Sequence, residues 1–232
     1  MMKLIRLEWK KNNVLKYVRN AGITTAVLLL FMIFMARELD AQETAQMMQL
    51  YGKSMLASSV EMFVHLSYII FTGVMIAAFI VGAYEKKTIN LMFSYPIRRS
   101  KIILAKICAV WIFNFLAMAG SKAVIFAALI LTRSFTGISA ASILVGDPSF
   151  WLDILVSSAA MVSISFIALP IGLKMKSSKA SIVASVVIVC FTQGNIGSAT
   201  LVNNIPFYAV LFVAAAVSAW LSVYNVEKKD LL

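Results

Sequence analysis

Long apolar runs alternate along the chain with short polar or basic segments. Most of these runs approach or exceed the roughly 20 residues that a helix needs to cross a hydrocarbon core of about 30 Å. We therefore predict an all-α integral membrane protein with six transmembrane helices. In chain order, the predicted spans are Ala21–Ala36, Met62–Tyr84, Ile107–Leu131, Phe150–Leu173, Ala180–Thr192 and Ile205–Tyr224.

The composition agrees with a membrane location. Of the 232 residues, 61% are hydrophobic and only 13% are charged, whereas a soluble domain is about 45–50% apolar and about 25% charged. The cysteines, Cys108 and Cys190, both lie inside apolar runs, so we interpret them as small hydrophobic residues rather than as a disulfide. A single histidine, His65, excludes a His-x-x-x-His metal site. We predict no metal ligand and no cofactor.

Basic residues are concentrated on one side of the predicted spans. Of the 21 lysines and arginines, 17 fall in the N-terminal segment, the second-to-third and fourth-to-fifth connections and the C-terminal tail. Cytoplasmic loops carry such an excess, so we expect a multi-pass cell-membrane protein with both termini in the cytoplasm. The net charge of +11 then reflects topology. Because it is spread over four connections, we expect no nucleic-acid partner.

Residues 1–20 are expected to form an interface helix on the membrane surface. Over Met2–Arg19, apolar side chains share one side of a helix while most basic side chains point elsewhere, and Trp9 is placed to anchor it. A basic amphipathic helix binds an anionic cytoplasmic leaflet, so membrane lipid is a predicted partner. The alternative is an ordinary positive flank without helical order. The apolar positions are Leu4, Leu7, Val14, Leu15 and Val18.

The fifth run is too short for a straight span. Glycines, amides and a proline follow it over Gln193–Pro206, and such groups at membrane depth need protein or water around them. We therefore predict a re-entrant segment between the fifth and sixth helices. We place Gln193 and Asn195 on a candidate translocation path.

Few ionisable residues lie inside the predicted spans. Lys122 lies within the third span, and ionisable groups at that depth usually face the protein interior or water. We therefore name Lys122 as a third candidate for the translocation path. Alternatively, Lys122 pairs with an acid such as Asp153, or its side chain snorkels outward. His65, one turn after Glu61, is better explained by a structural hydrogen bond than by a proton relay. Small residues open the fifth span and permit close helix packing, within the chain or between two chains. They are Ser177, Ser181 and Ser185.

No pattern in the sequence is typical of a catalytic site. The segment Tyr51–Ser54 resembles the end of a nucleotide-binding P-loop, but the motif needs a glycine five residues before Gly52, where Met47 stands. Acidic and nucleophilic residues do not cluster either. We therefore predict that the chain is not an enzyme and does not itself hydrolyse ATP by a P-loop.

The connection between the second and third spans, residues 84–106, combines a small apolar face with positive charge. A short helix after Glu85 would place three large apolar side chains on one face, and Pro96 disfavours helix at the residue before it. Held between two spans at the cytoplasmic surface, this coupling segment has the features of a docking knob. The apolar face consists of Ile89, Met92 and Phe93, and the charge beside it includes Arg98 and Arg99.

The coupling segment also resembles the cytoplasmic connection of the ABC type-2 permeases. That pattern has a Glu, a Gly-Thr, a Leu-rich turn, a Pro, an Arg and a downstream Lys. The run from Glu85 through LMFSYPIRRSKIILAKI follows it except at the glycine, where Lys87 stands. The matching residues are Glu85, Thr88, Leu91, Pro96, Arg99 and Lys106. In layout the whole chain is similar to that family, with an interface helix, six spans and an interrupted segment before the sixth.

The resemblance implies that residues 1–232 form a single transmembrane permease domain of an ABC exporter. It further implies that ATP hydrolysis takes place on a separate ABC ATPase subunit, and that the permease forms a homodimer, or a heterodimer with a second permease. The residues that would then act in ATPase coupling are Glu85, Thr88, Ile89, Met92, Phe93, Pro96, Arg98 and Arg99. Peptides, antibiotics and lipid-linked molecules are all open as substrates, with antimicrobial peptide resistance as one role. The alternative that we keep is a stand-alone secondary transporter or channel, which Lys122 would support. A membrane enzyme would need a catalytic cluster that the sequence does not offer.

Overall fold

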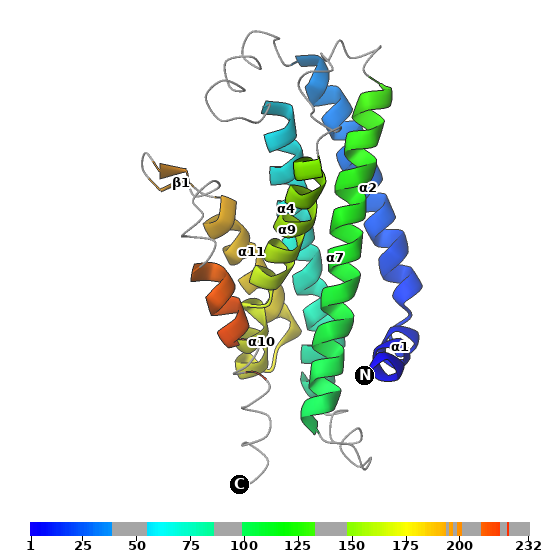
Figure 1. Cartoon of the computed structure of the whole chain (residues 1–232). Coiled ribbons are helices and arrows are strands. Elements are labelled where there is room, and N and C mark those ends of the chain that lie inside the picture. Colours follow the sequence, from blue (N-terminus) through cyan, green and yellow to red (C-terminus); the bar gives the residue numbers. More distant parts are fainter. Residues whose placement is uncertain are drawn as a thin grey trace. The chain divides into compact units, whose positions relative to one another are not determined.

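The computed structural model describes residues 1–38, 55–85, 99–132, 148–193, 195–196, 199–200, 210–218 and 222. Helices make up almost all of this part of the chain (Figure 1). They are α1 (Met2–Lys11), α2 (Val14–Glu38), α4 (Met55–Ile76), the π-helix η1 (Ala77–Val81), α5 (Gly82–Glu85), α7 (Arg99–Leu131), α9 (Pro148–Ser165), α10 (Ala168–Met175) and α11 (Ser178–Gln193). Residues 210–218 are also helical. Strand β1 (Asn195–Ile196) pairs antiparallel with β2 (Ala199–Thr200).

Among the described residues, four stretches are long and apolar enough to cross a membrane, and they coincide with the first four predicted spans. They are Val14–Ala36, Leu56–Glu85, Lys101–Leu131 and Pro148–Met175. The fifth predicted span forms α11, whose 16 residues are fewer than a straight span requires. The sixth span and the re-entrant segment stay predictions, because much of residues 194–232 lies outside the described part of the chain.

The N-terminal segment differs from the single helix predicted over Met2–Arg19. Helix α1 ends at Lys11 and α2 begins at Val14, with Asn13 between them at φ 48°. Asparagine tolerates this left-handed conformation better than most residues, and the Asn12 amide donates to the Glu8 carbonyl at 3.0 Å. The short polar side chains of the Asn-Asn pair thus end one helix before the next begins.

The predicted lipid-facing stripe is divided on α1, where Leu4 packs against Ile5 and the α7 alanines. Leu7 is 62% exposed, whereas Ile5 and Glu8 are buried. Because Leu7 faces outward, this side of α1 is available to lipid, and its contact with a membrane stays a prediction.

The chain divides into two compact units. Unit 1 comprises Met1–Val14, Tyr68–Phe115 and Ala159–Leu232, and unit 2 comprises Leu15–Ser67 and Leu116–Ser158. Each is described separately below. That the whole chain acts as one permease domain stays a prediction.

Close packing of small residues joins α4, α10 and α11 in unit 1. A Cβ placed on Gly73 would lie 1.7 Å from Ser185 Oγ, and a Cβ on Gly172 would lie 2.8 Å from Ser181 Cβ. Both serines are fully buried. Ser181 and Ser185 of the predicted serine row therefore pack within the chain, as the small-residue spacing allows.

A break between α9 and α10 interrupts the fourth predicted span. Pro170 has no N–H to donate to the Phe166 carbonyl one turn earlier. The Leu169 N–H donates to this carbonyl instead, at 3.0 Å, as a carbonyl at membrane depth requires. Ser218 Oγ also lies 3.3 Å from it, although its single hydrogen is better used by the Ala215 carbonyl at 2.8 Å. Ser218 thus places the residue 210–218 helix beside the break.

Edge-to-face aromatic contacts join the helices of unit 2. Phe31 meets Phe63 edge-on at a ring-centroid distance of 5.0 Å, and Phe126 meets Phe150 in the same way at 5.0 Å. Lys122, in this unit, is fully buried.

Candidate functional site

A buried ion pair connects α1, η1 and α7 in unit 1. Lys106, on α7, is 1% exposed, and its Nζ lies 2.9 Å from Glu8 Oε2 on α1. The same Nζ donates to the Phe79 carbonyl in η1, also at 2.9 Å. One ammonium group therefore joins three elements that are far apart in the sequence.

The π-helix explains why the Phe79 carbonyl accepts a side-chain donor. A π-turn closes its hydrogen bonds over five residues rather than four, which locally disrupts the regular ladder of the helix. A side chain can insert where the regular hydrogen-bond ladder of a helix is disrupted. Lys106 does so at the Phe79 carbonyl, so η1 in the second span is tied to α7 in the third.

Apolar contacts secure α1 against α7 around the ion pair. Ile5 packs with Ala105 and Ala109, and Trp9 Nε1 donates to the Ala109 carbonyl at 3.1 Å. Because Trp9 and Glu8 both bind groups of α7, the orientation of α1 is defined by polar contacts as well as by burial. The N-terminal helix is therefore part of the packed structure of unit 1.

A second carboxylate joins the end of α5 to the start of α11. The Glu85 carboxylate accepts from the Ser178 backbone N–H at 3.1 Å and from Ser178 Oγ at 2.5 Å. Ser178 is the first residue of α11, where unpaired N–H groups and the helix dipole favour an anion. Ser178 Oγ also lies 3.5 Å from the Ala77 carbonyl, but its single hydrogen is better used by the closer carboxylate.

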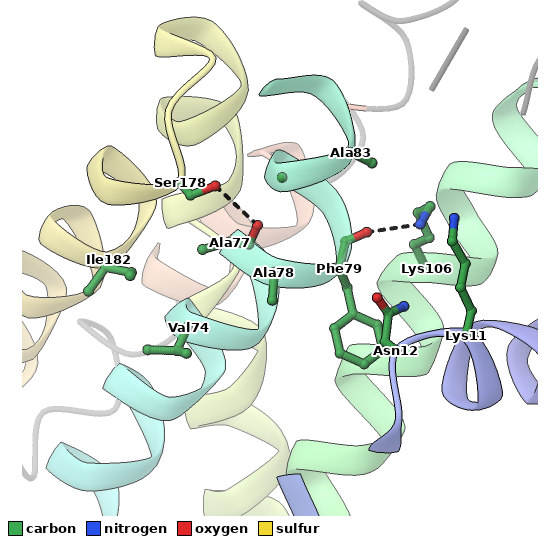
Figure 2. Close-up of a pocket in the computed structure, with 11 residues that line it drawn as sticks. Lys11, Asn12, Val74, Ala77, Ala78, Phe79, Ala83, Lys106, Ser178 and Ile182 are labelled. Carbon is green, nitrogen blue, oxygen red and sulfur yellow. Dashed lines mark hydrogen bonds between the residues drawn. The ribbon is translucent and has the colours of Figure 1, made fainter. Parts of the chain in front are cut away.

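These elements surround a pocket of about 470 Å³ in unit 1. Figure 2 shows Lys11, Asn12 and Lys106 on one side of it and Val74 and Ile182 on the other. The remaining lining residues are Ala77, Ala78, Phe79, Gly82, Ala83 and Ser178. The pocket therefore has a basic side and an apolar side.

A family model described as "ABC-2 family transporter protein" matches residues 4–193. The chain belongs to the ABC-2 family. The match covers α1, the coupling segment and α11, so it includes both carboxylate contacts described above. Members of this family are membrane transport subunits that are not themselves catalytic, and they normally work with an ATPase subunit.

A curated relative spans the same length as this ABC-2 chain. It is "Uncharacterized protein YcbO" of Bacillus subtilis (strain 168), 24% identical over 232 residues, which cover 99% of this chain and 100% of the relative. No solved structure matches this chain. The comparisons thus identify the family without indicating a substrate.

Most predicted coupling residues of this ABC-2 chain lie outside the described part. This holds for Thr88, Ile89, Met92, Phe93, Pro96 and Arg98. Arg99 begins α7, although its side chain is not described. Glu85 is described in full, and its carboxylate is bound to the start of α11.

The three candidates for a translocation path fall in different units. Lys122 lies in unit 2, where its Nζ donates to Ser157 Oγ at 2.7 Å and lies 2.8 Å from His65 Nε2. Its full burial rules out outward snorkelling, and His65 has the hydrogen bond expected of it. Gln193 ends α11 and Asn195 begins β1, both in unit 1. A shared path through these three residues stays a prediction.

Sequence reasoning missed the role of Glu8 and underestimated Lys106, which it counted only as a topology-setting charge and a family match. One signal was present: Glu8 is the only acidic residue among the first 37, in a segment otherwise rich in lysine and arginine. An isolated acid in a basic helix indicates a specific contact for Glu8, but it does not indicate that Lys106, 98 positions away, is the partner.

Proposed function

We propose that this chain is the membrane-spanning permease subunit of an ATP-binding cassette exporter. It would move a substrate out across the cell membrane, driven by ATP hydrolysis on a separate ABC ATPase. The observation that carries the proposal is the family match over residues 4–193, which includes the whole coupling segment. The four helices of membrane-crossing length support it.

The contacts at the two ends of the coupling segment, residues 84–106, support a role in force transmission. At its start, Glu85 binds the first residue of α11. At its end, Lys106 binds Glu8 of α1 and the Phe79 carbonyl of η1. A displacement of the segment by an ATPase would therefore be passed to several helices of unit 1.

The apolar face of the segment is the proposed contact with the ATPase. Ile89, Met92 and Phe93 would each contribute about 1.5–3 kcal/mol if fully buried in a cleft of the partner. Arg98 and Arg99 would orient the contact and make it sensitive to salt. We propose that the subunit works as a homodimer, or as a heterodimer with a second permease. Its substrate would be a peptide, an antibiotic or a lipid-linked molecule, with antimicrobial peptide resistance as one role.

Substitution of Phe93 tests the proposal. The wild-type chain should co-purify with a P-loop ATPase, and Phe93→Ala should lower the amount recovered at equal membrane expression. Phe34→Ala is a matched control, because Phe34 is 65% exposed on α2 and lies far from residues 84–106 in the sequence. Equal recovery for both variants, or no P-loop ATPase with the wild type, would contradict the exporter assignment.

The proposed topology has a separate test. Both termini are placed in the cytoplasm, together with the connection that holds Ser177. A membrane-impermeant thiol reagent added to intact cells should label Ser142→Cys and spare Ser177→Cys in a background without Cys108 and Cys190. The opposite labelling pattern would reverse the proposed orientation.

A stand-alone secondary transporter remains the second candidate. The buried contact between Lys122 and His65 favours it, since ionisable groups inside spans often belong to ion or proton pathways. Transport that persists without ATP and stops when the proton gradient is dissipated would support this alternative over the exporter.

A further inference from the structure

The pocket in unit 1 has a buried cation with an unused donor. Lys106 Nζ carries three N–H groups; it donates one to Glu8 and one to the Phe79 carbonyl. Within the described part of the chain, the third N–H has no acceptor. Lys106 lines the pocket although it is only 1% exposed overall. A donor of this kind in a sheltered pocket favours an anionic ligand.

A second cation lies near Lys106 on the same side of the pocket. Lys11, the last residue of α1, also lines it, and its charge acts on Lys106 (Figure 2). Glu8 is the acid paired with Lys106. A phosphate group at this side of the pocket would accept hydrogen bonds from both ammonium groups.

The opposite side of the pocket is apolar. Val74, Ala78 and Ile182 line it, and the small side chains of neighbouring η1 and α5 leave the space open. Val74 is 37% exposed on a helix that forms part of a predicted span, so this side is accessible from the apolar environment. Inorganic phosphate would leave the apolar side unused, whereas the acyl chain of a lipid would cover it.

We propose that this pocket binds one anionic phospholipid, with its phosphate at Lys11 and Lys106 and an acyl chain along Val74, Ala78 and Ile182. The site goes beyond the exporter function. It depends on membrane insertion but not on an ATPase. It also differs from general attraction of α1 to a charged leaflet, because the lipid would occupy one built pocket.

Lipid titration of the purified chain in neutral detergent tests the site. Native mass spectrometry would count bound phosphatidylglycerol, with phosphatidylcholine as the zwitterionic comparison. We expect one tightly retained phosphatidylglycerol and no equivalent retention of phosphatidylcholine. Lys11→Gln should weaken the retained lipid about five-fold, as loss of one lysine near a charged headgroup costs about 1 kcal/mol.

Lys10→Gln is the matched control, since it removes the same charge from the adjacent residue of α1, which does not line the pocket. It should leave retention within two-fold of the wild type. Equal weakening by both substitutions would show diffuse surface attraction and overturn the proposal. Equal retention of the two lipids would overturn it as well.

Two further measurements test whether the ligand is a lipid rather than free phosphate, and whether the apolar side of the pocket is needed. Millimolar inorganic phosphate should not displace phosphatidylglycerol; displacement would indicate a phosphate site without lipid specificity and would overturn the lipid assignment. Ala78→Phe, which fills the pocket from an exposed position, should abolish retention. If that variant does not fold, the comparison between the exposed Lys10 and Lys11 still decides the outcome, without any ATPase present.

Discussion

Neutralising Glu8 should strongly destabilise the chain, because the substitution leaves the Lys106 charge buried. Glu8→Gln keeps the size of the side chain and removes only its charge. At the observed 2.9 Å and an effective dielectric constant of about 20, the attraction in the pair is roughly 6 kcal/mol before the cost of desolvation. Removing one partner of a buried pair typically costs about 3–5 kcal/mol. We expect about 3 kcal/mol, since the carboxylate side chain is still 9% exposed.

A double-mutant cycle separates the ion pair from its surroundings. Lys106→Met alone should also cost about 3 kcal/mol, because it leaves a buried carboxylate. Glu8→Gln combined with Lys106→Met should cost only about 1–2 kcal/mol, chiefly for the lost hydrogen bond to the Phe79 carbonyl. The two single effects would therefore be far from additive.

The free energy of unfolding can be measured by SDS titration in mixed micelles with tryptophan fluorescence as the signal. Arg6→Gln, on the exposed side of α1, is the control and should change stability by less than about 0.5 kcal/mol. Single effects that add to within about 0.5 kcal/mol would refute the coupling between Glu8 and Lys106. A cost for Glu8→Gln no larger than that of Arg6→Gln would refute the burial of the pair.

Three further substitutions can be measured by the same titration. Gly73→Ala should destabilise by about 1–3 kcal/mol through overpacking against α11, whereas Gly120→Ala, with no atom within 4 Å of the added carbon, should cost nothing; equal effects would contradict the close packing at Gly73. Ser218→Ala should cost less than about 1 kcal/mol, because the hydroxyl donates to the nearby Ala215 carbonyl at 2.8 Å and the Phe166 carbonyl keeps the Leu169 N–H; a larger loss would show that the 3.3 Å contact of Ser218 with Phe166 stabilises the α9–α10 break. Lys122→Met should cost about 1–3 kcal/mol by leaving its buried hydrogen-bond partners without a donor, and a gain in stability would argue that the lysine is kept for transport instead.

The exporter proposal and the lipid-site proposal are tested by measurements other than the free energy of unfolding. ATPase recovery tests the coupling segment, and lipid retention tests the pocket. A stable Lys11→Gln variant that loses lipid but still recovers ATPase would place the two functions in different parts of unit 1. Lys11 is the residue suited to this comparison, because it lines the pocket but, unlike Lys106, does not belong to residues 84–106.

The spans and the family could be predicted from the sequence because both depend on local properties. A run of about 20 apolar residues favours a bilayer whatever its neighbours are, which is why Val14–Ala36 and Lys101–Leu131 are helices of membrane-crossing length. The pattern of Glu85, Pro96 and nearby basic residues indicated the ABC-2 family for a similar reason, since a short segment carries it.

The arrangement around the π-helix was decided by tertiary structure. Glu8 and Lys106 are separated by 98 positions, and no local pattern shows that one buried charge will meet the other. Hydropathy alone likewise predicts one regular helix over Met62–Tyr84. The structure instead has a π-turn at Ala77–Val81, where Lys106 of α7 donates to the Phe79 carbonyl. Long-range partners choose among backbone geometries of similar local energy, so the ion pair, the π-turn and the pocket beside them emerge only when the helices pack.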